Sequence, residues 1–298
     1  AQECGGGSVK KSFAYPYGVW LAVFILAPIL MVVVYAFLNA DGGFTLHNFS
    51  YLPGYLPIFG RSFWLAFLST VVCLALGYPM AYLMSRLSAS KQSLCMMLIM
   101  LPMWINFLLR TYAWMSILEN NGLLNQLFQQ IGLIDLYNQV AMHFAADPAA
   151  YVPIDHFQMI GTQGAVVLGM VYNYLPFMIL PIYSVIVKLD HRFIEAARDL
   201  GADSATVFRR VTLPLSLPGV LSGITMVFVP AVSTFAISQL LGGGKQLLLG
   251  NLIEMQFKGT AYNPQLGSAV ALVMMLVVVV CMTVMNRFGE GEEQAVML

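Results

Sequence analysis

The chain has 298 residues, of which 59% are hydrophobic and 9% are charged, and its mean hydropathy is +0.77. Because soluble domains carry about 25% charged residues, this composition excludes an ordinary soluble protein and favours a polytopic membrane protein. The formal net charge is zero, so the charge balance indicates no nucleic-acid partner.

Six apolar runs are long enough to span a bilayer, which requires about 20 residues. They lie near 17–38, 63–84, 94–118, 162–187, 217–240 and 266–288. The first run is too long for the core of a signal peptide and lacks a convincing cleavage site, so we predict that it is retained. The predicted organisation is an N-terminal tail at 1–16, a transmembrane domain at 17–288 with a cytoplasmic loop at 188–216, and a C-terminal tail at 289–298.

The basic residues predict the orientation, because cytoplasmic loops are enriched in Lys and Arg. With a cytoplasmic N-terminus, the inside would carry Lys10, Lys11, Arg86, Lys91, Lys188, Arg192, Arg198, Arg209, Arg210 and Arg287. The outside would carry Arg61, Lys245 and Lys258, with Arg110 inside a span. We therefore expect both termini in the cytoplasm and a mildly acidic outer face.

The stretch "EAARDLGADSATVFRRVTLP" at 195–214 is far more polar than its surroundings. Residues 192–200 pattern as a short amphipathic helix, and Gly201 follows where a helix C-cap requires a left-handed residue. Asp203 or Ser204 can cap a second helix, which Pro214 and Pro218 are expected to stop. Two short angled helices on the membrane surface are predicted. An interfacial loop without further function would fit the same pattern.

The spacing within this stretch resembles the EAA signature of ABC importer permeases. Glu195-Ala196-Ala197 is followed after three residues by Gly201, and after nine more by Val211, then Leu213 and Pro214. The resemblance implies a coupling helix that docks on a separate ATPase subunit. The residues assigned to this contact are Glu195, Ala196, Ala197, Arg198, Asp199, Gly201, Leu213 and Pro214.

No motif for ATP hydrolysis or other catalysis is present in the sequence. The segment "GGGKQ" at 242–246 lacks the leading Gly and the Ser or Thr that a phosphate-binding loop requires, and a turn is the simpler interpretation. The histidines and cysteines show no metal-ligand spacing. We therefore expect no catalytic residue, metal or cofactor on this chain, and ATP with Mg²⁺ on the ATPase partner.

A candidate transport path follows from polar and aromatic residues inside the spans, at "PMWINFLLRTYAWMSILENNG" and "YNYLPF". Aromatic side chains could hold an organic cation, although an interfacial aromatic belt explains most of them equally well. Arg110 could extend to the outer surface or pair with an acid. The candidate path residues are Trp104, Asn106, Tyr112, Trp114, Tyr172, Asn173, Tyr174 and Glu254.

Further stretches, including "LGYPMAYLMSRL", "VYNYLPFMILPIYSVIVKLD" and "LLGGGKQLLLGNLI", resemble the spermidine/putrescine permease family. This resemblance implies the all-α, six-span type I ABC importer permease fold in a bacterial inner membrane. It also implies two ATPase copies, a sibling permease and an extracytoplasmic polyamine-binding protein. The outer loop at 141–161 is longer than the family pattern predicts.

Other functions remain open at this point. Related permeases carry thiamine, ferric ion or phosphonate, but a phosphonate path should contain more basic groups than the single Arg110. An ion-coupled carrier or channel normally places Asp, Glu or His near the centre of a span, and the six predicted spans contain none there. We therefore expect a polyamine importer subunit without enzymatic activity of its own.

Overall fold

The computed structural model describes residues 16–39, 42–144, 152–259 and 262–296. Every regular element in these ranges is helical, apart from an isolated antiparallel bridge between Leu38 and Phe44. The all-helical fold class is therefore confirmed. The predicted N-terminal tail up to residue 15 and part of the loop at 141–161 lie outside the described residues. The chain forms two compact units, residues 1–56 with 252–279, and residues 57–251 with 280–298.

The first unit contains the first predicted span and parts of the last helices. Its elements are η1 (Ala22–Leu26), α2 (Ala27–Ala36), α3 (His47–Ser50), the beginning of α4 (Leu52–Ser85), most of α14 (Leu249–Lys258) and the first part of α15 (Pro264–Val296). Ala36, Ala269 and Leu272 form a small buried cluster. The Asn48 amide donates to the carbonyls of Ala36 and Leu38, at 3.0 and 2.9 Å, and so satisfies acceptors at the end of α2.

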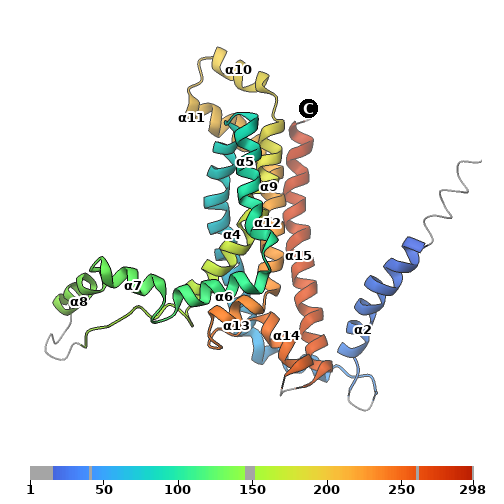
Figure 1. Ribbon diagram of the computed structural model, residues 1–298. Coiled ribbons are helices and arrows are strands. Elements are labelled where there is room, and N and C mark those ends of the chain that lie inside the picture. The colour runs from blue at the N-terminus through green and yellow to red at the C-terminus, as the bar shows by residue number, and fades with distance from the viewer. Residues whose placement is uncertain (1–15, 40–41, 145–151, 260–261, 297–298) are drawn as a thin grey trace, which may run out of the picture. The chain divides into compact units, whose positions relative to one another are not determined.

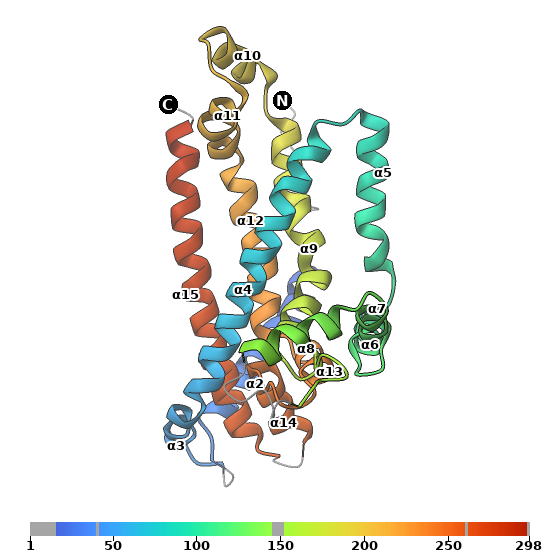
Figure 2. The same ribbon diagram turned by 90° about the vertical axis from the view of Figure 1, so that its left-hand side faces the viewer.

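The second unit is a bundle built around α4, α9 and α12, which run side by side (Figures 1 and 2). Its other elements flank or extend this bundle. They are α5 (Ala89–Met100), η2 (Leu101–Trp104), α6 (Phe107–Leu118), α7 (Leu123–Gln130), α8 (Leu133–Phe144), α9 (Gln163–Lys188), α10 (His191–Asp199), α11 (Ser204–Val207), η3 (Phe208–Thr212), α12 (Leu213–Ser233) and α13 (Ala236–Leu241). In both views α10 and α11 lie at one end of the bundle, and α6 and α13 at the other.

Glycines allow the central helices to approach closely. A Cβ atom at Gly77 of α4 would lie 3.0 Å from the Met178 side chain of α9. A Cβ atom at Gly223 of α12 would lie 2.8 Å from the Met178 sulfur and 3.1 Å from its carbonyl oxygen. Met178 is fully buried between these helices. Close backbone approach at small residues is the usual way in which membrane helices gain packing energy, because lipid is as apolar as their side chains.

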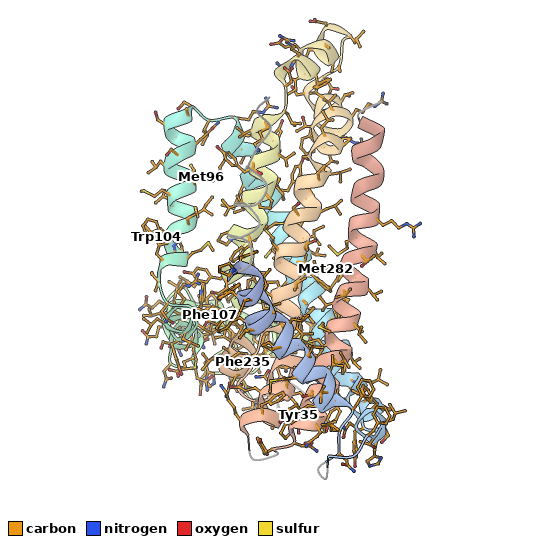
Figure 3. The ribbon with its side chains drawn as sticks, turned by 90° about the vertical axis from the view of Figure 1, so that its right-hand side faces the viewer. Tyr35, Met96, Trp104, Phe107, Phe235 and Met282 are labelled. Carbon is orange, nitrogen blue, oxygen red and sulfur yellow. The ribbon has the colours of Figure 1, made fainter. Side chains whose placement is uncertain are left out.

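Five of the six predicted spans correspond to single helices, Pro16–Ala36, Leu52–Ser85, Gln163–Lys188, Ser204–Ser233 and Pro264–Met285, among the residues described. The third predicted span is not one straight helix, because Ala89–Trp104 and Phe107–Gln130 meet at 89°. Ile105 and Asn106 have extended backbone, and the Asn106 side chain caps α6 by accepting from the Leu108 amide at 2.8 Å. Figure 3 shows Trp104 and Phe107 on either side of this break.

The predicted stop at Pro214 and Pro218 is wrong. Helix α11 continues through the π-helical turn η3 into α12, so that residues 204–233 form one helical segment. Pro214 lies in the first turn of α12, and Pro218 lies within that helix. The π-helical turn at 208–212 lies directly before these prolines, and at its end the Leu213 amide donates to the Phe208 carbonyl. The second helix of the polar stretch is therefore the end of a span rather than a separate surface helix.

Candidate functional site

The polar stretch 195–214 begins within α10, a helix whose described residues are exposed except for the half-buried Ile194 and Ala197. Asp190 caps it by accepting from the Arg192 amide at 2.9 Å. The apolar side chains of Phe193 and Leu200 are 58% and 90% exposed. Glu195, Arg198 and Asp199 are exposed as well. A short helix whose apolar and charged sides both lack cover is a surface suited to another molecule.

Gly201 ends α10 as predicted, with a φ of +83°. The Ala202 amide donates to the Ala197 carbonyl at 3.0 Å, and the Gly201 amide donates to the Arg198 carbonyl at 2.8 Å. This pair of bonds is the Schellman motif, which requires one residue in the left-handed backbone conformation. Glycine adopts that conformation without strain. A Cβ atom at Gly201 would meet nothing within 4 Å, so only the backbone conformation requires glycine in the isolated chain.

The next helix begins at Asp203, one of the two predicted caps. Its carboxylate accepts a hydrogen bond from the Thr206 amide at 3.2 Å. The hydroxyl and amide of Thr206 hold the pKa of the Asp203 carboxyl below its ordinary value, because both favour the ionised form. The caps at Asp190 and Asp203 therefore define where each half of the polar stretch begins.

The second half of the polar stretch is fixed to α4 by an aromatic contact that the sequence did not predict. The Phe208 ring lies edge-on to Tyr78 and Tyr82, with ring centroids 5.9 and 5.1 Å away. The Tyr78 hydroxyl lies 2.9 Å from the Ser216 hydroxyl of α12. Arg86 donates to the Tyr82 hydroxyl at 2.7 Å and covers the same ring. No spacing in the sequence relates Phe208 to α4.

A hollow of about 470 Å³ lies between the two halves of the stretch. It is lined by Ala197, Leu200, Gly201, Ala202, Asp203, Thr206, Val207, Arg210 and Val211. Of the predicted coupling residues, half-buried Ala197 and exposed Gly201 line it, and the others are exposed outside it. Within 192–214 the described charged side chains form no ion pair with one another. The arrangement therefore offers a concave surface of mixed polarity, in which the charged Asp203 and Arg210 lie among apolar residues.

The structure brings together part of the predicted path. Trp114 and Tyr172 form an edge-to-face pair with ring centroids 5.4 Å apart. The Arg110 guanidinium carbon lies 6.0 Å from the centroid of the same Tyr172 ring. Arg110 and Trp114 are one turn apart on α6, so that both reach Tyr172 from the same helix face. The Nε and Nη1 atoms of Arg110 are buried and have no protein hydrogen-bond partner.

The other predicted path residues are not gathered at this cluster. Tyr174 points to α12, where its hydroxyl donates to the Pro230 carbonyl at 3.4 Å. Asn173 is buried and donates to the Gly169 carbonyl at 2.8 Å. Trp104 and Tyr112 are exposed, and Asn106 serves as the cap of α6. Half-buried Glu254 lies on α14 in the first unit. These assignments to a path remain predictions.

Residues 242–246, considered above as a phosphate-binding loop, form a turn after α13. The Gly161 backbone amide donates to the Leu241 carbonyl at 2.9 Å. The Gln246 side-chain amide donates to the Gly161 carbonyl at 3.2 Å. The turn therefore connects the chain before α9 with the end of α13. In the described ranges, His, Cys, Asp and Glu side chains form no group of three or more that could hold a metal ion.

Comparisons with known proteins agree with this architecture. The family described as "binding-protein-dependent transport system inner membrane component" matches residues 15–290. The spermidine/putrescine transport system permease protein PotB of Haemophilus influenzae is 38% identical over 261 residues, which cover 85% of this chain and 84% of that protein. PotB of Escherichia coli K12 is 37% identical over 246 residues, covering 80% of this chain and 82% of that protein.

A solved bacterial ABC transporter involved in the import of alginate is similar in fold, with a TM-score of 0.76 and 14% identity, covering 95% of both chains. The MetNI methionine ABC transporter gives a TM-score of 0.55 at 16% identity, covering 80% of this chain and 95% of that one. These similarities support the ABC importer permease fold. The chain belongs to the family of inner membrane components of binding-protein-dependent transport systems.

Proposed function

We propose that this chain is the membrane subunit of an importer that moves polyamines into the cytoplasm. The observation that carries the cargo is the 38% identity, over 85% of the chain, to a spermidine/putrescine permease. The composition of the chain is consistent with this cargo, since the predicted spans contain several aromatic residues and, apart from Arg287 near the end of the last span, Arg110 as their single basic residue. Aromatic faces attract organic cations, whereas an anionic cargo would favour basic groups.

The energy for transport comes from a separate ATPase that docks on the segment 191–214. The exposed apolar and charged sides of α10, together with the hollow next to it, support this contact. ATP and Mg²⁺ then bind to that partner, and this chain contributes no catalytic residue. Two ATPase copies, a sibling permease and an extracytoplasmic binding protein complete the assembly. The basic residues favour a cytoplasmic location for both termini and for this segment.

The continuity of α11, η3 and α12 supports a mechanism for coupling. A displacement of the docked α10 first reaches α11 across Gly201. It is then passed to α12 along the continuous helix 204–233, and to α4 through Phe208, which contacts Tyr78 and Tyr82. Because packed helices move as rigid bodies, a small shift at the cytoplasmic end becomes a rearrangement of the bundle. At the other end of the bundle, Trp114 and Arg110 of α6, which belongs to the bent third span, meet Tyr172 of α9, and this cluster is the proposed part of the path there.

The test is ATP hydrolysis by the complex purified gently from native membranes through a tag on this chain. We expect hydrolysis to rise when the binding protein is loaded with spermidine and to stay low with the same binding protein unloaded. If hydrolysis does not respond to spermidine but rises with a binding protein loaded with another compound, the polyamine cargo is wrong and the importer function stands. If no ATPase accompanies the chain, even after mild cross-linking, the importer itself is contradicted and a channel or ion-coupled carrier becomes the better hypothesis.

A further inference from the structure

The guanidinium of Arg110 is partly enclosed in the bundle. Its Nε and Nη1 atoms are buried, and neither has a hydrogen-bond partner among the residues that the structure describes. An arginine side chain stays charged in proteins, and a buried donor without a partner is unfavourable. The burial of these two atoms also argues against a guanidinium that extends freely into the water at the outer surface.

The helices around Arg110 offer it no carboxylate. Helix α6 packs against α9 and α13, and these two helices pack against each other as well. The sequences of α6, α9 and α13 contain no Asp or Glu, and their one other charged residue is Lys188 in the last turn of α9. A charge kept inside a membrane span without a compensating charge is costly, so its presence indicates a function.

The contact that the structure shows for this guanidinium is with an aromatic ring. The Arg110 Cζ atom lies 6.0 Å from the centroid of Tyr172. Cation–π attraction extends to about 6 Å, so this contact is at its outer limit and is weak enough to be exchanged. Trp114 holds the same ring in an edge-to-face pair, with centroids 5.4 Å apart. The long Arg110 side chain can therefore leave the ring while Trp114 keeps the ring in place.

The same ring suits an ammonium group of the cargo. Tyr172, Trp114 and Arg110 are each half-buried, so the cluster is enclosed enough to strengthen a cation–π contact without being sealed from a ligand. A cargo ammonium and the guanidinium carry the same charge and repel each other at short distance. One face of the ring therefore holds either group, but not both.

We propose that Arg110 is a built-in competitor of the cargo. Its guanidinium and a cargo ammonium bind the same face of Tyr172, and each displaces the other. The inference rests on the proposed function, in which the cargo is an organic cation. It adds a residue that sets the affinity of the path for that cargo without touching it.

Competition of this kind weakens cargo binding by a defined factor. The apparent dissociation constant is the intrinsic one divided by the fraction of molecules in which the face is free. If Arg110 holds the face in about nine tenths of the molecules, the cargo binds about tenfold more weakly than it would without Arg110. Weak binding suits a transport path, because a cargo must leave the path as well as enter it.

The first test measures binding of radiolabelled spermidine to the purified complex by equilibrium dialysis, without binding protein or ATP. Arg110→Met keeps a long unbranched side chain but removes the charge, and it should tighten binding about tenfold. The control is Arg61→Met, which removes a half-buried positive charge near the start of α4 and should change binding by less than about twofold. Unchanged or weaker binding by Arg110→Met, or equal tightening by both variants, would overturn the inference.

The same assay identifies the ring as the place of competition. Tyr172→Leu removes the aromatic face, so that adding Arg110→Met to it should no longer tighten binding. Tyr172→Phe keeps the face, and the effect of Arg110→Met should remain. An effect of equal size in both backgrounds would mean that Arg110 acts by general repulsion of cations, and the proposed competition at Tyr172 would be wrong.

The second test uses the unaltered complex and so does not depend on the folding of a variant. Phenylglyoxal modifies accessible guanidinium groups, and mass spectrometry of the modified peptides gives the rate at each arginine. Saturating spermidine should raise the rate at Arg110 several-fold relative to that at Arg61, because displacement from Tyr172 frees its buried nitrogens. Protection of Arg110 by spermidine, or an unchanged rate, would contradict a displaced competitor.

The outcomes separate this inference from the function on which it rests. Suppose that ATP hydrolysis rises with the spermidine-loaded binding protein, but Arg110→Met binds spermidine no more tightly. The importer then stands, and Arg110 is not a competitor. If hydrolysis does not respond to spermidine, the polyamine cargo is wrong and the inference falls with it.

Discussion

The two halves of the polar stretch differ in how they are held. Helix α10 contacts little of the bundle, and its apolar residue Leu200 is 90% exposed. The following segment α11–η3 is continuous with α12 and is fixed to α4 through Phe208. An exposed helix can be bound, and a fixed one can transmit a displacement. The comparison therefore assigns docking to α10 and transmission to η3, with Gly201 as the joint between them.

The largest effect is expected from substituting that joint. Gly201→Asp puts a charged side chain on a left-handed residue, at a backbone cost of about 1–2 kcal/mol. The chain should still fold and insert, because a Cβ atom there meets nothing within 4 Å. Transport should nevertheless be abolished, because the new side chain projects into the docking surface. Uptake of labelled polyamine by cells or proteoliposomes is the measurement.

Gly244→Asp is the matched control for this substitution. Gly244 also has a positive φ, of +72°, and open space around it, but it lies in the turn after α13. It carries the same strain without touching the polar stretch, so most transport should remain. Normal uptake by Gly201→Asp, or equal loss in both variants, would remove the support for docking at this joint.

A smaller effect, on stability and on coupling, is expected from Phe208→Ala. The substitution removes the edge-on contacts with Tyr78 and Tyr82 and should destabilise the chain by roughly 1–3 kcal/mol, less than the loss of a fully buried aromatic, because Phe208 is half-buried. Hydrolysis by the complex should persist while polyamine uptake falls, because α4 no longer follows η3. Thermal unfolding in detergent and parallel measurements of hydrolysis and uptake test this prediction.

The control for Phe208→Ala is the same substitution on the exposed half, Phe193→Ala. Phe193 is 58% exposed on α10, so its loss should leave the stability of the isolated chain nearly unchanged. It should instead weaken ATPase binding. If both variants lose equal stability, the distinction between a free and a fixed half is wrong.

The smallest effect concerns the cap at Asp203. Hydrogen bonds from Thr206 lower the pKa of this carboxyl in the folded chain. The cap therefore contributes stability above the unfolded pKa of about 3.9, and this contribution is lost as the pH falls through the lower folded value. Amide hydrogen exchange in 204–212, corrected for intrinsic rates, should show protection at pH 6 that declines below pH of about 4. Asp203→Asn keeps an acceptor and should abolish the decline; identical acid profiles for both chains would contradict the assignment.

Local features of the site were predictable because each depends on a few neighbouring residues. The amphipathic pattern located α10, and the position of Gly201 indicated its C-cap. An N-cap was expected at Asp203 or Ser204, and the structure selects Asp203. Pro214 and Pro218 misled the prediction for a local reason as well. Proline is unfavourable within a helix, but membrane helices tolerate it where local π-helical adjustments and neighbouring groups satisfy the freed carbonyls, and a π-helical turn lies directly before Pro214.

The sequence by itself determined that this is a helical membrane protein with an EAA-type segment, because apolar run length and short-range spacing are written into consecutive residues. Only the tertiary structure decided that the third span bends by 89°, that Phe208 joins η3 to α4, and that Trp114 and Arg110 meet at Tyr172 while Tyr174 turns to α12. Such contacts join residues from 56 to 130 positions apart. They depend on how whole helices pack, and local periodicity holds no information about which helix faces which.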